Sequence, residues 1–524
     1  MSLQPPVVET RSGPVLGTAL PADEAHQQPV SRFLGIPFAA PISGSARFLP
    51  PAPVVPWTDV RHATEYGAFC PQEASAIGAL LGAKKTAGGD DCLNLNVWTP
   101  ADHAPSRPVM VWIHGGAYVT GTGATPWYDG QRFAANHDVV VVTINYRLGA
   151  LGYLDLTTLV PGAVDIASPN NGLLDQIAAL EWVRDGIDAF GGDPSNVTIF
   201  GESAGAMSVG TLLGAPGAKG LFRRAILQSG ASEHISGPDR ARRLAASFLA
   251  ALGVPETPEG IATLATRDIN EIIAASQSAG AAATAAEAGG LAWQPSAATV
   301  SLPEHPLDVV GSGALSGVDV LFGTTRDEMR LFTAFDPAVA TIDEAGIRQR
   351  LTRTVGTSTA ERIAAAYLGD VPGRSTLHTW SEIATDEVFR APAHRLAVAL
   401  HKGAANSLWA YEFAWPTPVF GGGLGSCHAL EIPFVFDNLH QPGVAMFTGS
   451  GTERQGIADL LHPAWASFAR HGDPNIGASP KAPQWLAWDP EERHTMIVGI
   501  EPELLSDPRG EALRRWPARP TALH

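Results

Sequence analysis

The stretch Val197-Thr198-Ile199-Phe200-Gly201-Glu202-Ser203-Ala204-Gly205-Ala206 decides how the rest of the chain is interpreted. Four residues typical of a strand run into a Gly-x-Ser-x-Gly motif, and small residues typical of a helix follow. A sharp turn at this point would expose the hydroxyl of Ser203. Side chains at Gly201 or Gly205 would collide across so tight a turn. The stretch therefore predicts a nucleophilic serine between a buried strand and a helix.

A reactive serine also needs donors for the negative charge that develops on an acyl oxygen. The N–H of Ala204, directly after the serine, is one candidate donor. Upstream, His114-Gly115-Gly116-Ala117 follows the apolar run Val109–Ile113. Small residues there would let the N–H groups of Gly116 and Ala117 approach a substrate carbonyl. We expect these two groups and that of Ala204 to form an oxyanion hole.

The base and the acid that would activate the serine are less sharply defined, because the chain has 16 histidines. In enzymes built around this motif, both partners follow the serine along the chain and the acid comes first. Glu328 lies just after the strand-like run Val318–Gly323, and its neighbour Asp327 competes for the role of acid. His428 lies in a loop beyond three consecutive glycines. The residues alone leave both acids open and make His428 one candidate base.

Strand-like and helix-like segments alternate along the chain. The β-branched run Asp138–Asn145 is the strongest strand, nearly continuous in apolar residues as in a sheet covered on both faces. Asn171–Phe190 has apolar residues at helical spacing and ends at two glycines. The alternation predicts an α/β protein with a large, mostly parallel central sheet flanked by helices.

The whole chain, residues 1–524, is expected to form one domain of this kind. Residues 231–315 and 330–405 are predicted as helical insertions that form a cap over the active site and a wall of its pocket. The low-complexity run Ala279–Gly290 within the first insertion is expected to be partly mobile.

Composition and charge limit the classes of partner. Of the 524 residues, 45% are hydrophobic and 17% are charged, which suits a globular protein with a large core. A formal net charge of −17 argues against nucleic acid or an anionic membrane as partner. No apolar run approaches the roughly 20 residues of a membrane span. The first residues lack the features of a secretory signal, so a cytoplasmic location is expected.

Further motifs follow one another from about Val8 to Trp488, most sparsely between residues 231 and 315. They are Phe33–Pro41, Asp90–Trp98, Asn145–Arg147, Gly172–Gln176, Gly191–Gly205, Ala225–Gly230, Gly323–Glu328, His428–Phe436 and Arg470–Asn475. In this order they resemble the type-B carboxylesterases, a family that includes cholinesterases and bacterial para-nitrobenzyl esterases.

The resemblance implies the α/β-hydrolase fold and a serine esterase. It assigns the catalytic triad to Ser203, Glu328 and His428, and the oxyanion hole to the N–H groups of Gly116, Ala117 and Ala204. His428 would take the proton of Ser203, and Glu328 would orient the imidazole. The resemblance implies a small-molecule ester as substrate and neither a metal nor an organic cofactor.

Two residues beside the triad have more than one interpretation. Glu202 resembles a family glutamate that faces the active-site gorge and tunes the site, although it could instead be a surface residue of the turn. Cys427 precedes the predicted catalytic histidine, and a buried small residue is the expected interpretation.

The resemblance also implies structural contacts. Arg47 with Asp90, and Arg147 with Asp175, resemble two ion pairs that stabilise the family fold. Cys70 and Cys92 occupy positions where family members form a small-loop disulfide. The sequence leaves open whether that bond forms here.

The expected function is hydrolysis of small to medium aryl or alkyl esters. Residues 71–91 contain no aromatic residue, whereas cholinesterases use one there to bind a quaternary ammonium group. Choline esters are therefore not expected as substrates. The alternatives are hydrolysis of another acyl bond (a carbamate or lactone), acyl transfer, or a non-catalytic adhesion domain resembling cholinesterases. The physiological ester and the oligomeric state stay open, with a monomer favoured.

Overall fold

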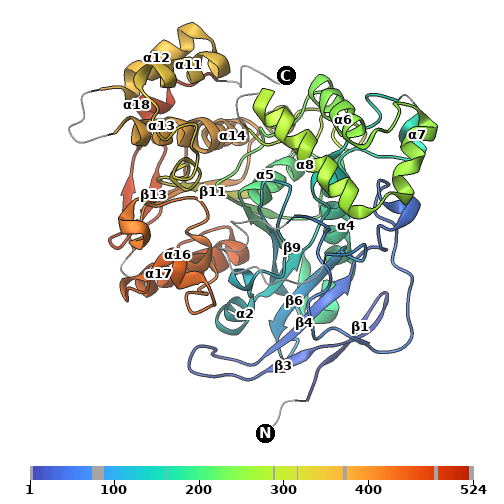
Figure 1. Ribbon diagram of the computed structural model, residues 1–524. Coiled ribbons are helices and arrows are strands. Elements are labelled where there is room, and N and C mark those ends of the chain that lie inside the picture. Colours follow the sequence, from blue (N-terminus) through green and yellow to red (C-terminus); the bar gives the residue numbers. More distant parts are fainter. Residues whose placement is uncertain are drawn as a thin grey trace.

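A central sheet organises the molecule (Figure 1). The computed structural model describes residues 4–73, 88–160, 162–286, 290–314, 317–369, 375–476 and 482–518. Over these ranges the sheet has 11 strands, in the order β14-β13-β12-β11-β10-β9-β7-β8-β6-β4-β3. They are β3 Thr18–Leu20, β4 Val30–Pro37, β6 Asn94–Pro100, β7 Arg107–Ile113, β8 Val140–Ile144, β9 Gly192–Glu202, β10 Arg224–Gln228, β11 Asp319–Thr325, β12 Ser407–Phe413, β13 Thr495–Val498 and β14 Glu503–Leu505.

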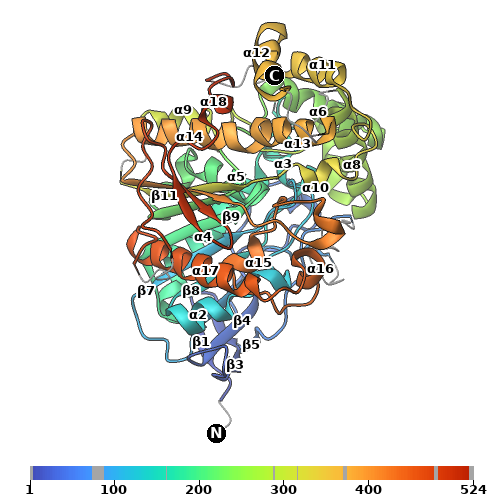
Figure 2. The same ribbon diagram turned by 90° about the vertical axis from the view of Figure 1, so that its left-hand side faces the viewer.

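The middle of this sheet is parallel and its two ends are antiparallel. From β8 through β7, β9, β10, β11 and β12 to β13, each strand pairs in parallel with the next. Strands β3, β4, β6 and β8 pair in antiparallel fashion at one end, and β13 with β14 at the other. Figure 2 shows the strands descending from β11 to β3. The prediction of a mostly parallel α/β sheet is confirmed.

Side chains alternate between two hydrophobic cores, one on each face of the sheet. In β7, Val109, Val111 and Ile113 belong to one core, whereas Met110 and Trp112 belong to the other. Every residue of this strand is buried. Burial on both faces explains why the central strands are apolar at almost every position in the sequence.

Helices cover both faces. Helices α4 (Asn171–Gly186) and α5 (Ala204–Leu212) pack into the first core, and α2 (Gln131–His137) and α17 (Glu453–His471) pack into the second. The predicted helix over 171–190 is α4 followed by a 3₁₀ turn, Ile187–Phe190. A small separate sheet contains β1 Val7–Thr10, β2 Gly13–Leu16 and β5 Arg61–His62, and short helices complete the body: α3 Gly149–Tyr153, α15 Ile432–Val435, α16 Val444–Thr448 and α18 Gly510–Leu513.

The described residues of the two predicted insertions contain helices. These are α6 Pro238–Leu252, α7 Pro258–Ala262, α8 Ile269–Ala286, α9 Pro306–Gly311, α10 Arg330–Thr333, α11 Glu344–Val355, α12 Thr357–Tyr367, α13 Thr376–Thr385 and α14 Ala391–Lys402. The low-complexity run from Ala279 is helical as far as Ala286, because alanine is the strongest helix former. Residues 287–289 lie outside the described ranges. A cap role for these helices stays a prediction.

One of the two expected ion pairs forms. Arg147 and Asp175 are both fully buried, with 2.7 Å between Arg147 Nη2 and Asp175 Oδ1. The expected pair between Arg47 and Asp90 is wrong, because the Arg47 guanidinium instead donates to the main-chain oxygens of Leu264 and Arg267. A main-chain oxygen satisfies an arginine N–H as a carboxylate does, and the sequence does not distinguish the two.

The two cysteines that could have formed a disulfide, Cys70 and Cys92, are free and buried. The sulfur of Cys70 accepts a hydrogen bond from the N–H of Leu148 at 3.4 Å. Most of the aromatic-free loop between them, residues 74–87, lies outside the described residues. Among the helices of the described ranges, none is long and apolar enough to cross a membrane.

We expect Asp175→Asn to lower the free energy of unfolding by about 3–5 kcal/mol, because it leaves the Arg147 guanidinium buried without a counter-charge. The matched control is Asp185→Asn, which breaks an exposed pair with Arg184 and should cost about 0–1 kcal/mol. Urea unfolding followed by tryptophan fluorescence measures both. Equal midpoints for the two variants would contradict a structural role for the buried pair.

Candidate active site

Ser203 lies on a strained turn between β9 and α5. Its backbone angles are φ 57° and ψ −127°, a region that residues with a side chain rarely adopt. Its N–H donates to the main-chain oxygen of Gln228 at 2.9 Å. A Cβ atom on Gly205 would lie 2.0 Å from the oxygen of Ile113, and one on Gly201 would lie 2.6 Å from it. The collision expected from the sequence is therefore with the end of β7.

The glycine-rich loop after β7 packs directly against this turn. A Cβ atom on Gly115 would lie 3.0 Å from the Cβ of Ser203. The next residues, Gly116 and Ala117, have positive φ angles of 114° and 55°. Ala204 is the first residue of α5, where N–H groups have no partner within the helix. The three predicted oxyanion donors thus lie on two segments that touch each other beside Ser203.

His114 stabilises this loop, a role that the sequence motifs do not indicate. Its ring stacks on Tyr146, with centroids 4.5 Å apart. The Tyr146 hydroxyl donates to the main-chain oxygen of His114 at 2.7 Å. Burial lowers the pKa of His114 to about 4. The imidazole is therefore neutral at physiological pH and holds the loop by stacking and hydrogen bonding.

His428 and Glu328 form the central contact of the site. Nδ1 of His428 lies 2.6 Å from Oε2 of Glu328. The other carboxylate oxygen of Glu328 accepts the N–H of Thr325 at 2.8 Å, and the side chain is fully buried. Glu328 therefore holds the imidazole by one oxygen and is itself anchored to the end of β11 by the other.

Asp327, the competing acid, faces away from the imidazole. Its carboxylate pairs with Arg330 at 3.0 Å and accepts the N–H of Ser426 at 2.9 Å. The N–H of Asp327 donates in turn to the oxygen of Ser426, also at 2.9 Å. These contacts join the acid turn to the loop that carries His428. The structure thus distinguishes two adjacent acids that the residue pattern alone left open.

A second carboxylate, that of Glu202, lies at the other nitrogen of the imidazole. Its Oε1 is 3.0 Å from Nε2 of His428, and its side chain is 5% exposed. Within the described residues, Ser203 is not a hydrogen-bond partner of this ring. Burial raises the pKa of Glu202 to about 8. Burial also opposes the charging of His428, but the charges of Glu202 and Glu328 outweigh it and raise the histidine pKa to about 9.

A third buried carboxyl group, Glu431, completes the surroundings and was not identified from the sequence. Its Oε1 accepts a hydrogen bond from Gln228 at 3.2 Å, and Gln228 is fixed by the indole N–H of Trp465 at 3.0 Å. Burial raises the pKa of Glu431 to about 7. Three carboxyl groups so close together in a buried site cannot all ionise without a large electrostatic cost.

Two other neighbours of the imidazole are apolar. The ring centroids of Phe389 and Phe332 lie 4.9 Å and 5.2 Å from that of His428. Cys427 is buried, and burial raises the pKa of its thiol, as expected for a residue that acts as a small apolar side chain. Among the residues that the structure describes, no three or more His, Cys, Asp or Glu side chains lie together so that they could hold a metal ion.

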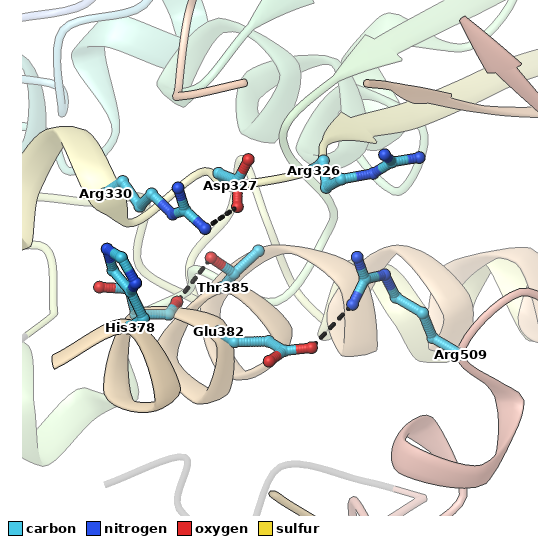
Figure 3. A pocket seen from close by; sticks show the side chains of 8 residues that line it. Arg326, Asp327, Arg330, His378, Glu382, Thr385 and Arg509 are labelled. Carbon is cyan, nitrogen blue, oxygen red and sulfur yellow. Dashed lines mark hydrogen bonds and ion pairs between the residues drawn. The ribbon is translucent and has the colours of Figure 1, made fainter. Parts of the chain in front are cut away.

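A polar cavity of about 350 Å³ lies on the outer side of the acid turn. Figure 3 shows Arg330 directed at Asp327 and Arg509 directed at Glu382 across it. Its described lining is entirely polar and includes no residue of the predicted triad. The hydroxyl of Thr385, which also lines it, accepts the N–H of Met329 at 3.1 Å. These contacts secure the turn on either side of Glu328.

The chain matches the carboxylesterase family over residues 4–516. It is 38% identical to the para-nitrobenzyl esterase of Bacillus subtilis, across 96% of this chain and 97% of that protein. It is 34% identical to the phenmedipham hydrolase of Pseudarthrobacter oxydans, across 90% and 91% of the two chains. Among solved structures, a carboxylesterase of Geobacillus stearothermophilus superposes with a TM-score of 0.85 at 40% identity, covering 98% of this chain and 100% of that one.

These matches extend over nearly the whole length of the relatives as well as of this chain. The expected resemblance and the expected α/β-hydrolase fold are therefore confirmed, and the family and its esterase relatives support ester hydrolysis. The chain belongs to the carboxylesterase family and is a type-B carboxylesterase.

Proposed function

We propose that the enzyme cleaves small to medium aryl or alkyl esters through an acyl-enzyme on Ser203, with His428 as base and Glu328 as the orienting acid. The observation that carries this proposal is the 2.6 Å contact between the buried Glu328 carboxylate and Nδ1 of His428. It leaves Nε2 as the nitrogen that can act on a substrate, and Ser203 lies partly exposed on a strained turn.

In the proposed reaction, Ser203 Oγ bonds to the ester carbonyl carbon while His428 Nε2 accepts its proton. The carbonyl oxygen becomes negatively charged, and the N–H groups of Gly116, Ala117 and Ala204 stabilise it. When the carbonyl re-forms, the alcohol leaves with the proton from His428. Water then attacks the acyl group in the same way, and the carboxylic acid product leaves Ser203 free.

Glu202 lies beside the nitrogen of His428 that the proposed reaction uses. The contact with Glu328 assigns a hydrogen to Nδ1 of His428, so a neutral imidazole has only a lone pair at Nε2. The Oε1 atom of Glu202 lies 3.0 Å from Nε2 but makes no hydrogen bond with it, so the contact is electrostatic. Because Ser203 needs the same nitrogen, His428 must exchange Glu202 for the serine hydroxyl before attack. Glu202 is thus proposed to tune the site.

Membership of the family does not identify the substrate. Relatives are named for phenmedipham, cocaine and fumonisin B1 as well as for para-nitrobenzyl esters. A carbamate and a lactone therefore belong in the substrate panel beside p-nitrophenyl esters of increasing acyl length. Activity confined to the carbamate and the lactone would replace ester hydrolysis with hydrolysis of another acyl bond, the alternative that the sequence left open.

Ser203→Ala is expected to lower kcat for p-nitrophenyl esters by about 10⁴- to 10⁶-fold, and His428→Ala to a similar degree, because the two residues act as one unit. Ser195→Ala and His401→Ala, on the surface, serve as matched controls. Undiminished hydrolysis by Ser203→Ala would exclude the acyl-enzyme mechanism.

Glu328→Gln is expected to lower kcat by about 10⁴-fold, because an amide cannot stabilise the imidazolium and can favour the wrong tautomer. The neighbouring variant Asp327→Asn is the control and should lose far less activity, since Asp327 only joins two loops. Steady-state kinetics of the two variants decide between the acids. The reverse order of effects would make Asp327 the acid.

Glu202→Gln is expected to move the acid limb of the kcat/KM profile to lower pH. Activity is lost as pH falls through the pKa of His428, because the protonated ring cannot accept the serine proton. Removing the Glu202 charge lowers that pKa from its raised value, so the neutral ring persists to lower pH. Glu431→Gln, with a weaker influence on His428, is the control. An unchanged limb, or one at higher pH, would show that Glu202 does not set this pKa.

A further inference from the structure

A π-helical turn, Asp386–Arg390, joins α13 to α14 beside the proposed triad. The ring centroid of Phe389, within this turn, lies 4.9 Å from that of His428. The guanidinium of Arg390, the next residue, donates to the main-chain oxygen of Arg326, two residues before the proposed acid. π-helical turns are rare and are frequently found at functional sites. One short turn therefore contacts both the imidazole of the proposed base and the segment that carries the proposed acid.

The junction between these helices holds the main chain on both sides of Glu328. Before it, the oxygen of Arg326 accepts the hydrogen bond from Arg390. After it, the N–H of Met329 donates to the hydroxyl oxygen of Thr385 at 3.1 Å. That hydroxyl gives its own hydrogen to a main-chain oxygen of α13 at 2.7 Å, which leaves its lone pairs for the turn. Residues five apart lie on one side of a π turn, whereas in an α-helix about 140° would separate them. The π turn thus lets Thr385 and Arg390 act on the same segment.

Two buried carboxylates hold Arg390 itself in place. Its side chain is 7% exposed and pairs with Asp386, which is 1% exposed. The other carboxylate oxygen of Asp386 accepts the hydroxyl of Tyr367, and the indole N–H of Trp516 donates to that hydroxyl at 3.2 Å. The carboxylate of Glu412, on β12, lies 3.6 Å from Nε of Arg390. Burial opposes the charge of Arg390, but the two carboxylates outweigh it and raise the arginine pKa. The guanidinium is therefore charged and has little freedom to move.

Different nitrogens of this one guanidinium make the two hydrogen bonds. Nη1 of Arg390 donates to Asp386, and Nη2 donates to the oxygen of Arg326. A guanidinium is planar and rigid, so fixing one of its nitrogens directs the other. The ammonium group of a lysine is a single flexible point charge and has no such fork. The position of the main chain before Glu328 therefore follows from that of the helix junction.

We propose that Arg390 and Thr385 are positioning residues for ester hydrolysis, which hold the acid turn so that the Glu328 carboxylate meets Nδ1 of His428. The proposal rests on the proposed function, because it gives that contact its purpose in the reaction. Both residues act through Glu328 rather than on the reacting atoms. The same turn carries Phe389 against the imidazole, so a displaced junction would disturb the acid and the base together.

Thr385→Val removes the oxygen that accepts the Met329 N–H and keeps nearly the same side-chain shape. We expect kcat for p-nitrophenyl acetate to fall by about 10-fold with KM little changed, because a small misplacement of a catalytic group costs up to about 100-fold in rate. Thr385→Ser keeps the hydroxyl and should keep most of the activity. Equal losses of kcat in the two variants would assign the effect to packing and overturn the role of the Thr385 hydrogen bond.

Arg390→Lys keeps the charge beside Asp386 but loses the fork, so its kcat is expected to fall by about 10- to 100-fold with KM little changed. The matched control is Arg395→Gln, which breaks a forked pair with Glu233 on the same helix, with contacts of 2.5 and 2.6 Å. It should keep the parent kcat. Full activity in Arg390→Lys would show that charge alone suffices. An equal loss in Arg395→Gln would reduce the effect to stability, and either result would overturn the proposal.

Proton NMR without substrate reports the position of the acid directly. The hydrogen on Nδ1 of His428, in a short contact with a carboxylate, gives a strongly deshielded resonance. We expect Thr385→Val and Arg390→Lys to move this resonance upfield or broaden it beyond detection, and Arg395→Gln to leave it unchanged. A resonance that stays in place in both positioning variants would overturn the proposal, whatever happens to kcat.

The same spectrum separates this proposal from the proposed function. If hydrolysis of p-nitrophenyl acetate does not depend on Ser203, the proposed function fails. The resonance of the His428 Nδ1 hydrogen requires no turnover, and it is recorded in Ser203→Ala alone and with Arg390→Lys added. Loss of the resonance in the double variant alone would support the role of Arg390 in placing Glu328, and its persistence would overturn that role.

Discussion

The contact between the turn after β9 and the end of β7 is the constraint on which the site depends. A Cβ atom at Gly205 would lie 2.0 Å from the oxygen of Ile113. Only glycine permits this approach, and the approach brings the serine turn against the loop of Gly116. Ser203, the proposed nucleophile, and two of the three proposed oxyanion donors are therefore held together by main-chain packing, before any side chain contributes. A site held in this way is pre-organised, since the proposed donors need not move when charge develops.

The second organising feature is the concentration of carboxyl groups around one imidazole. Glu328 and Glu431 are fully buried, and Glu202 is nearly so. Burial favours the protonated form of a carboxyl group, whereas an imidazolium favours the ionised form. The carboxyl group of Glu202 is buried beside His428, and its charge raises the pKa of that histidine against the effect of burial. The loops that bear these residues are tied to one another through Asp327 and Ser426, so the geometry does not rest on the ion pair alone.

The surroundings of the site include a polar, ion-paired part and an apolar, aromatic part. The outer side of the acid turn is an ion-paired cavity that secures Glu328 (Figure 3). The apolar neighbours of His428 are the rings of Phe332 and Phe389. Among the proposed catalytic groups, Ser203 and Glu328 follow the ends of β9 and β11, whereas His428 and these rings lie on the connections between strands. Connections vary more readily than sheets, which accounts for relatives named for different substrates on one fold.

The sequence by itself determined the sheet, the nucleophile turn and the family. These depend on patterns between near neighbours along the chain: runs of β-branched residues, and glycines on either side of Ser203. Only the tertiary structure showed which of the two acids contacts His428, identified Glu431 beside it, and replaced the expected partner of Arg47. Each of these depends on segments far apart in sequence, such as residues 328 and 428. Which atoms such segments bring together depends on backbone direction and competing hydrogen bonds, and a residue pattern contains neither.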